Sequence, residues 1–159
     1  MTDTNHPSAR IGHVHLKVSD IERGLGFWRD VIRLEVQARY GENQVFLWAG
    51  GYHHHIAHNN WMSKGAGPAP KRAAGLFHVA LVYPDRAALA QAVRRVVVSG
   101  VAIEGASDHG VSEAVYLCDH DGNGVEIYWD RPPEECPRHA DGSLAITTER
   151  LELPAPLAS

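Results

Sequence analysis

Apolar residues follow two different periods along this chain, and the changes between them mark the predicted elements. Helical spacing of apolar side chains runs through residues 21–32 and again through residues 89–97. The remaining pattern consists of short apolar or alternating runs bounded by glycine, proline, asparagine or aspartate, which are typical of strands. The pattern therefore predicts two amphipathic helices among short strands.

Local signals predict where these elements begin and end. Ser19 and Glu22 have the S-x-x-E spacing of a capping box, which predicts the start of the first helix. Gly100 is a good C-terminal stop for the second helix. One strand is expected before each helix, and the strands expected after the helices are 34–39, 45–49, 52–58, 101–104, 114–119 and 125–129.

The two halves of the chain repeat one pattern. Residues 12–32 align with residues 77–97 at an offset of 65 residues, and this alignment places His13 on His78. Each half reads as β-α-β-β-β, so we expect an α+β fold built from two paired modules.

We expect these modules to form a single domain over residues 1–159. The stretch SKGAGPAPKRAAG is rich in glycine, proline and lysine and is typical of an exposed connection. The expected boundaries are module one at 10–61, a linker at 62–75, module two at 76–131 and a C-terminal tail at 132–159.

Composition and charge restrict the function classes. Shares of 44% hydrophobic and 21% charged residues are those of an ordinary globular protein. The net charge of −4 gives no basic surface for nucleic acid or an anionic membrane, and no apolar run is long enough to cross a bilayer. The polar N-terminus lacks a signal-peptide pattern, so a cytoplasmic location is expected. The 11 histidines point to metal or proton chemistry.

Three residues are candidate metal ligands. His13 and His78 hold equivalent places at the starts of equivalent strands, so pseudo-twofold packing would bring them together on one face. Glu126 stands alone in an apolar strand between Val125 and Ile127, where a carboxylate is costly to bury unless a cation faces it. Two imidazoles and one carboxylate make a triad that leaves several positions on a divalent metal open.

The segment from His109 to Glu126 follows the pattern H-x5-V-Y-x2-D-x2-G-x3-E. Together with the repeated modules it resembles the vicinal oxygen chelate superfamily over about residues 10–131, and within it the type I extradiol ring-cleaving dioxygenases. The resemblance implies an open eight-stranded cup with the helices outside. It also implies Fe(II), with Mn, Zn or Ni as alternatives, held by His13, His78 and Glu126. The expected partners are a catechol-type aromatic diol, O2 and a second copy in a homodimer, and the modules can pair within one chain or between two.

By the same resemblance, His109 and Tyr116 are the catalytic residues. One diol hydroxyl must lose a proton and a proton must later be returned, and an imidazole, which titrates near neutral pH, suits both transfers. The Tyr116 hydroxyl can donate a hydrogen bond to a substrate oxygen. The simpler alternatives are a solvated loop histidine and an aromatic packing residue.

The run YHHHIAHNNW at 52–61 supplies further candidates for the substrate pocket. If these residues form one strand, its parity places His54 and His58 on the face that flanks the pocket. His15, two residues after His13, shares the face of that ligand. The alternative is a histidine-rich surface strand without a chemical role.

A fourth ligand position separates the competing functions. Glyoxalase-like relatives take a further ligand from this strand, and the corresponding place is Ile56, which cannot bind a metal. An alignment shift of one residue would put His54 or His55 there instead. Fewer protein ligands leave more open positions, as a dioxygenase requires. The alternatives are a glyoxalase-like metal isomerase or lyase, and a metal-free small-molecule binding protein of the drug-resistance type.

Overall fold

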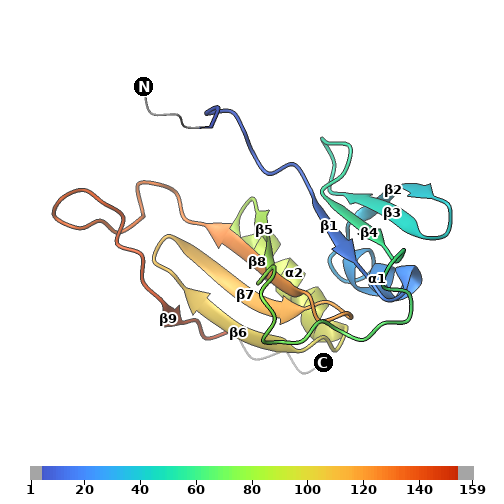
Figure 1. Cartoon of the computed structure of the whole chain (residues 1–159). Helices are drawn as coiled ribbons and strands as arrows, with labels where there is room; N and C mark the ends of the chain where they lie inside the picture. Colours follow the sequence, from blue (N-terminus) through green and yellow to red (C-terminus); the bar gives the residue numbers. More distant parts are fainter. Residues whose placement is uncertain (1–4, 154–159) are drawn as a thin grey trace.

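The computed structural model describes residues 5–153, which form two sheets that each carry one helix (Figure 1). The first module consists of β1 (Val14–Lys17), α1 (Ile21–Trp28), β2 (Glu35–Tyr40), β3 (Gln44–Trp48) and β4 (Ile56–Asn59). The second consists of β5 (Val79–Tyr83), α2 (Arg86–Val98), β6 (Ile103–Asp108), β7 (Ser112–Cys118) and β8 (Gly124–Asp130). A further strand, β9 (Glu149–Arg150), comes from the C-terminal tail.

Both sheets have the same topology. The strand order is β1-β4-β3-β2 in the first sheet and β5-β8-β7-β6-β9 in the second. In each module the first strand runs parallel to the last, and the other neighbours are antiparallel. The predicted α+β fold and its repeated β-α-β-β-β module are confirmed. Within residues 5–153 the strands form two separate open sheets, and β9, on the outer edge of β6, has no counterpart in the prediction.

The two helices begin at equivalent aspartates. Asp20 accepts a hydrogen bond from the backbone N–H of Arg23, and Asp85 accepts one from that of Ala88, each at 2.7 Å. The capping box predicted at Ser19 is therefore wrong, because the next residue is the N-cap. No helix within residues 5–153 is long and apolar enough to cross a bilayer.

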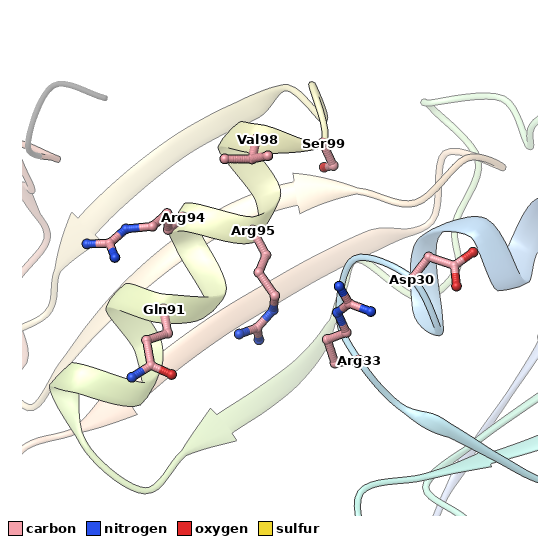
Figure 2. Close-up of a pocket in the computed structure, with 7 residues that line it drawn as sticks. All are labelled: Asp30, Arg33, Gln91, Arg94, Arg95, Val98 and Ser99. Atoms are coloured by element: carbon pink, nitrogen blue, oxygen red, sulfur yellow. The ribbon is translucent and has the colours of Figure 1, made fainter. Parts of the chain in front are cut away.

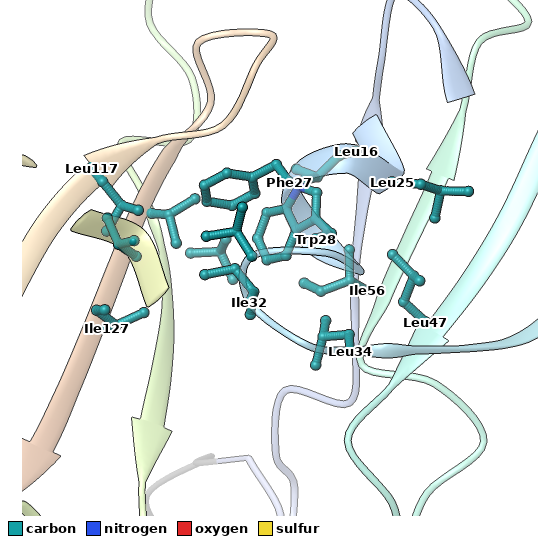
Figure 3. Close-up of a cluster of buried hydrophobic side chains, with 14 of the residues drawn as sticks. Leu16, Leu25, Phe27, Trp28, Ile32, Leu34, Leu47, Ile56, Leu117 and Ile127 are labelled. Carbon is teal, nitrogen blue, oxygen red and sulfur yellow. The ribbon is translucent and has the colours of Figure 1, made fainter. Parts of the chain in front are cut away.

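One hydrophobic core joins the two modules. Figure 3 shows Phe27 and Trp28 of α1 between Leu47 of the first sheet and Ile127 of the second, and all four side chains are fully buried. Burial of these side chains at the junction removes apolar surface of both modules from water. The modules therefore stabilise each other through the faces of their sheets that the helices cover.

The carboxylate of Asp119 connects the second module to this core. The side chain is buried and accepts hydrogen bonds from the backbone N–H groups of Asp121 and Asn123, both at 2.9 Å. It also accepts one from Asn123 Nδ2 at 2.9 Å and one from Trp28 Nε1 at 3.1 Å. One carboxylate thus organises the β7–β8 turn and attaches it to α1 of the other module.

A second polar contact supports the same junction. Asp121 Oδ1 accepts hydrogen bonds from the backbone N–H of Ser19 and from Arg23 Nη1, both at 3.1 Å. Arg23 Nη2 also donates to the carbonyl of His120. The start of α1 is therefore held against the β7–β8 turn.

We expect Asp119→Ala to lower the free energy of unfolding by roughly 2–4 kcal/mol, because it leaves the buried Trp28 N–H and the turn N–H groups without acceptors. The measurement is urea unfolding followed by tryptophan fluorescence. Asp141→Ala is the matched control, since Asp141 accepts two hydrogen bonds from Ser143 in an exposed turn of the tail. An equal loss in both variants would show that the buried carboxylate contributes no more to stability than one in an exposed turn.

Candidate metal centre

Glu126 lies on the face of the second sheet that is opposite the core. Its neighbours Val125 and Ile127 are buried in the core, so Glu126 points the other way, as the alternation of the strand predicts. Across the sheet, Glu126 is paired with Ala80 of β5 and with Tyr116 of β7. The carboxylate is therefore flanked by strands on both sides, and only 13% of its side chain is exposed.

His78 meets this carboxylate from the start of β5. Its Nε2 lies 2.9 Å from Oε2 of Glu126, while its Nδ1 is buried and has no hydrogen-bond partner among the described residues. The backbones approach closely here, because a Cβ on Gly124 would collide with the carbonyl of Phe77. The structure thus brings two of the three predicted ligands together, and an imidazole with a carboxylate is a donor set suited to a divalent metal.

Tyr116 and His109 continue this polar chain. Tyr116 is cross-strand from Glu126, and burial together with the negative charge of Glu126 raises the pKa of the phenol. The Tyr116 hydroxyl lies 2.7 Å from Nε2 of His109, which stands in the turn between β6 and β7. Tyr116 therefore lies next to the His78–Glu126 pair, and His109 lies next to Tyr116.

His13 does not reach this pair within one chain. It precedes β1 of the first sheet, and its ring centroid lies 4.3 Å from that of His54 and 6.3 Å from that of His53. Within residues 5–153, no group of three or more His, Cys, Asp or Glu side chains is arranged to hold a metal. The reason is geometric, because the two open faces lie on opposite sides of the shared core.

His15 and His54 lie with His13 at the open face of the first sheet. His15 Nε2 is 2.9 Å from Asn59 Nδ2, and burial followed by the charge of His13 lowers its pKa. The ring of His54 packs at 4.9 Å on Phe46, and its pKa is lowered by burial and then by the neighbouring imidazoles. The expected strand over 52–58 is shorter in the structure, since β4 begins at Ile56, so strand parity does not govern the position of His54.

His58 lies in the core, not beside a pocket. It is 0% exposed on the helix side of β4, where its ring packs 6.0 Å from that of Trp28 and against Gly24. Neither ring nitrogen has a hydrogen-bond partner in the described part of the chain. Burial lowers its pKa to about 4, so the ring is neutral at pH 7. The predicted pocket role of His58 is therefore not supported by its position.

Two contacts around His109 are absent from the prediction. His109 Nδ1 lies 3.0 Å from the backbone carbonyl of Thr147 in the tail. Arg131 pairs with Asp108 at 2.5 Å and with Glu113 at 3.3 Å, on either side of the histidine turn. A contact made by a backbone carbonyl cannot be predicted from the residue type. Charged residues that flank a hairpin are only a weak indication of such a contact.

A surface cleft of about 380 Å³ lies elsewhere, between α2 and the turn after α1 (Figure 2). Arg33, Arg94 and Arg95 line it, and none of the predicted site residues does. Figure 2 shows Arg94 directed away from Arg33, and Arg95 Nε donates to the carbonyl of Val31 at 3.2 Å. This cleft is separate from the histidines, and Arg95 connects α2 to the chain that follows α1.

The chain is similar to proteins that share one fold and differ in activity. Residues 10–127 match the Glyoxalase/Bleomycin resistance protein/Dioxygenase superfamily. A catechol-2,3-dioxygenase of Bacillus subtilis (strain 168) is 36% identical over 149 residues, which are 93% of this chain and 51% of that protein. The chain therefore spans about half the length of this relative.

Two solved structures extend the comparison of the fold. A glyoxalase/dioxygenase from Nostoc punctiforme has a TM-score of 0.66 at 15% identity, over 83% of this chain and 99% of that one. A lactoylglutathione lyase from Agrobacterium tumefaciens has a TM-score of 0.61 at 22% identity, over 78% of this chain and 96% of that one. At these identities the two structures show a shared fold alone.

His58→Leu tests the buried neutral histidine. In the unfolded chain the His58 imidazole takes up a proton below its ordinary pKa of 6.5, whereas in the folded chain it does so only near pH 4. The free energy of unfolding of the wild type therefore falls as the pH decreases through this window. We expect the stability of the variant relative to wild type to rise by roughly 1.4 kcal/mol per pH unit from pH 6.5 towards 4. Urea unfolding at several pH values measures this difference, with His139→Gln in the exposed tail as control. A difference that does not change with pH would show that the buried ring is not held neutral.

Proposed function

The chain belongs to the Glyoxalase/Bleomycin resistance protein/Dioxygenase superfamily, and on this premise we propose that it is a metal-dependent extradiol dioxygenase. Its substrates are a catechol-type aromatic diol and O2. The relative at 36% identity, a catechol-2,3-dioxygenase, supports this choice among the activities of the superfamily. Fe(II) is the proposed metal, with Mn, Zn and Ni as alternatives, and the cytoplasm stays the expected location.

One observation carries the proposal. His78 and Glu126 meet at 2.9 Å on the open face of the second sheet, and Tyr116 and His109 follow on the same face at 2.7 Å from each other. This arrangement supports the proposal because an imidazole that can serve as the acid/base lies one residue away from two candidate metal ligands. An isomerase or lyase that uses the glutamate as its proton carrier has no need for the His109–Tyr116 pair, so the pair favours the dioxygenase.

Each residue has a distinct role in the proposed reaction. His13, His78 and Glu126 hold the metal, and iron would supply the redox chemistry that lets O2 react with an aromatic diol. His109 takes the proton of a diol hydroxyl on Nε2 and returns it later in the cycle. Without substrate the single Tyr116 hydroxyl proton lies towards His109 Nε2; when the diol binds, this hydroxyl donates to a substrate oxygen instead and so orients the diol. His15 and His54, on the open face that carries His13, are the proposed pocket residues.

We propose that a second copy of the chain completes the metal site. His13 lies on the open face of the first sheet and the His78–Glu126 pair on the open face of the second, and the common core lies between the two sheets. Large apolar side chains stand exposed beside both histidines: Ile11 is 88% and Phe77 is 87% exposed. In a twofold dimer, the first sheet of one copy faces the second sheet of the other, and two equivalent sites form.

Co-expression of two defective chains tests this arrangement. We expect His13→Ala and Glu126→Ala each to abolish stoichiometric iron as homodimers. A heterodimer of the two, purified through two different tags, should regain about half of the wild-type iron content, because one of its two sites has all three ligands. Iron content by elemental analysis is the readout.

The matched control is a heterodimer of His78→Ala with Glu126→Ala. These two ligands come from one module, so each site of this heterodimer lacks one of them and no iron should return. Recovery in neither heterodimer, although the wild type binds iron, would mean that the site forms within one chain.

The acid/base role of His109 predicts a specific order of activities. Proton transfer by a placed side chain contributes roughly 10²–10⁴-fold, so turnover of His109→Ala and of His109→Gln should fall by that factor with iron content unchanged. Tyr116→Phe should be less affected, because it loses one hydrogen bond and no proton carrier. The measurement is steady-state oxygen uptake with saturating catechol. Wild-type turnover in the His109 variants would remove the acid/base assignment, and absence of oxygen uptake by iron-loaded wild type would refute the dioxygenase.

A further inference from the structure

We infer that the C-terminal segment 145–150 positions His109, and that the backbone carbonyl of Thr147 holds the imidazole in the tautomer that leaves Nε2 free as the base. Thr147 is thus a positioning residue, and it does not touch the substrate. The inference rests on the proposed function only for the consequence in catalysis. The tautomer itself follows from the contacts of the ring.

The contacts of His109 specify where its proton lies. Nδ1 is 3.0 Å from the carbonyl oxygen of Thr147 and 3.3 Å from the hydroxyl of Thr148, and Nε2 is 2.7 Å from the hydroxyl of Tyr116. A carbonyl oxygen only accepts, so the hydrogen bond requires a proton on Nδ1. In the neutral ring Nε2 then carries a lone pair, and Tyr116 donates to it.

The tail is held at this position by its own backbone pairing. The N–H of Thr147 donates to the carbonyl of His109 at 3.0 Å, so the two residues are joined through the main chain as well as through the ring. On the C-terminal side, β9 pairs with β6, and the N–H of Leu151 donates to the carbonyl of Ala106 at 3.1 Å. Leu153 packs against the hydrophobic core. The carbonyl is therefore preorganised and is not a chance contact of a loose segment.

Gly110 permits the tail to approach this closely. Its φ of +74° lies in the left-handed region, and a Cβ there would meet Pro137 Cγ at 3.0 Å and the Ala145 carbonyl at 3.3 Å. The side-chain hydroxyl of Thr147 would lie equally close, at 3.3 Å. A glycine after the histidine thus serves both the turn and the seating of the tail.

The tautomer decides whether His109 can act as a base at the substrate. In the reaction, the Tyr116 hydroxyl turns to the substrate and releases Nε2, which accepts the proton of the diol hydroxyl and gives imidazolium. The proton on Nδ1 stays hydrogen-bonded to Thr147, and Nε2 later gives its proton back. An imidazole without this carbonyl prefers the proton on Nε2, which would present a donor where the reaction needs an acceptor. The Thr147 carbonyl removes that nonproductive form and stabilises the charged ring.

Ring ¹⁵N chemical shifts of His109 test the inference without metal or substrate, and comparison with His109→Gln assigns the signals. The full chain should show a protonated Nδ1 and an unprotonated Nε2. A chain ending at Ser143 should show the reverse, whereas a chain ending at Leu153 keeps β9 and should behave as the full chain. Thr148→Val should leave the tautomer unchanged, since the carbonyl remains.

Gly110→Ala in the full chain is the second variant, and it decides the question if circular dichroism shows that the shortened chain does not fold. It should shift the proton towards Nε2 by displacing the tail. With iron and catechol, both variants should lose roughly 10–10²-fold in kcat with a smaller change in KM. A proton on Nε2 in the full chain, or a proton kept on Nδ1 in both variants, would overturn the inference. If the tautomers are as expected but the iron-loaded wild type takes up no oxygen, the proposed dioxygenase activity is refuted and the positioning role of Thr147 is not.

Discussion

The buried carboxylate of Asp119 is the constraint on which the rest of the structure depends. It stands between Tyr116 and Glu126 in sequence, and its hydrogen bonds shape the turn that sets β7 against β8. The register of that hairpin places Tyr116 opposite Glu126. Through Trp28 Nε1 the same carboxylate attaches the hairpin to α1 of the other module. The geometry of the proposed site and the joining of the modules therefore share one group.

Each sheet has one face in the core and one open face, and this difference explains where polar groups are tolerated. On the core side His58 has no hydrogen-bond partner within residues 5–153, and burial keeps the ring neutral by lowering its pKa to about 4. On the open side Glu126 faces His78, and Tyr116 lies within reach of both His109 and Glu126. The same alternation that hides Val125 and Ile127 presents Glu126 to the open face. A metal ligand can be placed there at no cost to the core.

The C-terminal tail adds what the repeated modules lack. The modules supply the proposed ligands and a hairpin, whereas the turn that carries His109 is held by Arg131 at the end of the second module and by the tail. Arg131 binds Asp108 and Glu113 on the two strands of that hairpin, and Thr147 contacts the histidine itself. The tail thus contacts the proposed site of the second module only, and the two modules therefore differ chemically.

The sequence alone determined the features that depend on local periodicity. The β-α-β-β-β repeat, the equivalence of His13 and His78, and the orientation of Glu126 between Val125 and Ile127 follow from spacing, because strands and helices impose fixed periods on side-chain direction. The N-cap role of Asp20 could have been predicted by the same reasoning, because Asp85 holds the equivalent position and both side chains accept the capping hydrogen bond.

Tertiary structure alone decided the features that join distant segments. His58 lies in the core because it shares the face of β4 that carries Ile56, and the packing of β4 between β1 and β3 turns this face towards α1. The separation of His13 from His78 arises because helices and sheets of both modules share one core, which directs the open faces apart. The contact of Thr147 with His109 joins residues 38 positions apart, through the ring and through the main chain. Such contacts use main-chain atoms and packing surfaces that every residue type offers, so no pattern in the sequence identifies them before the chain has folded.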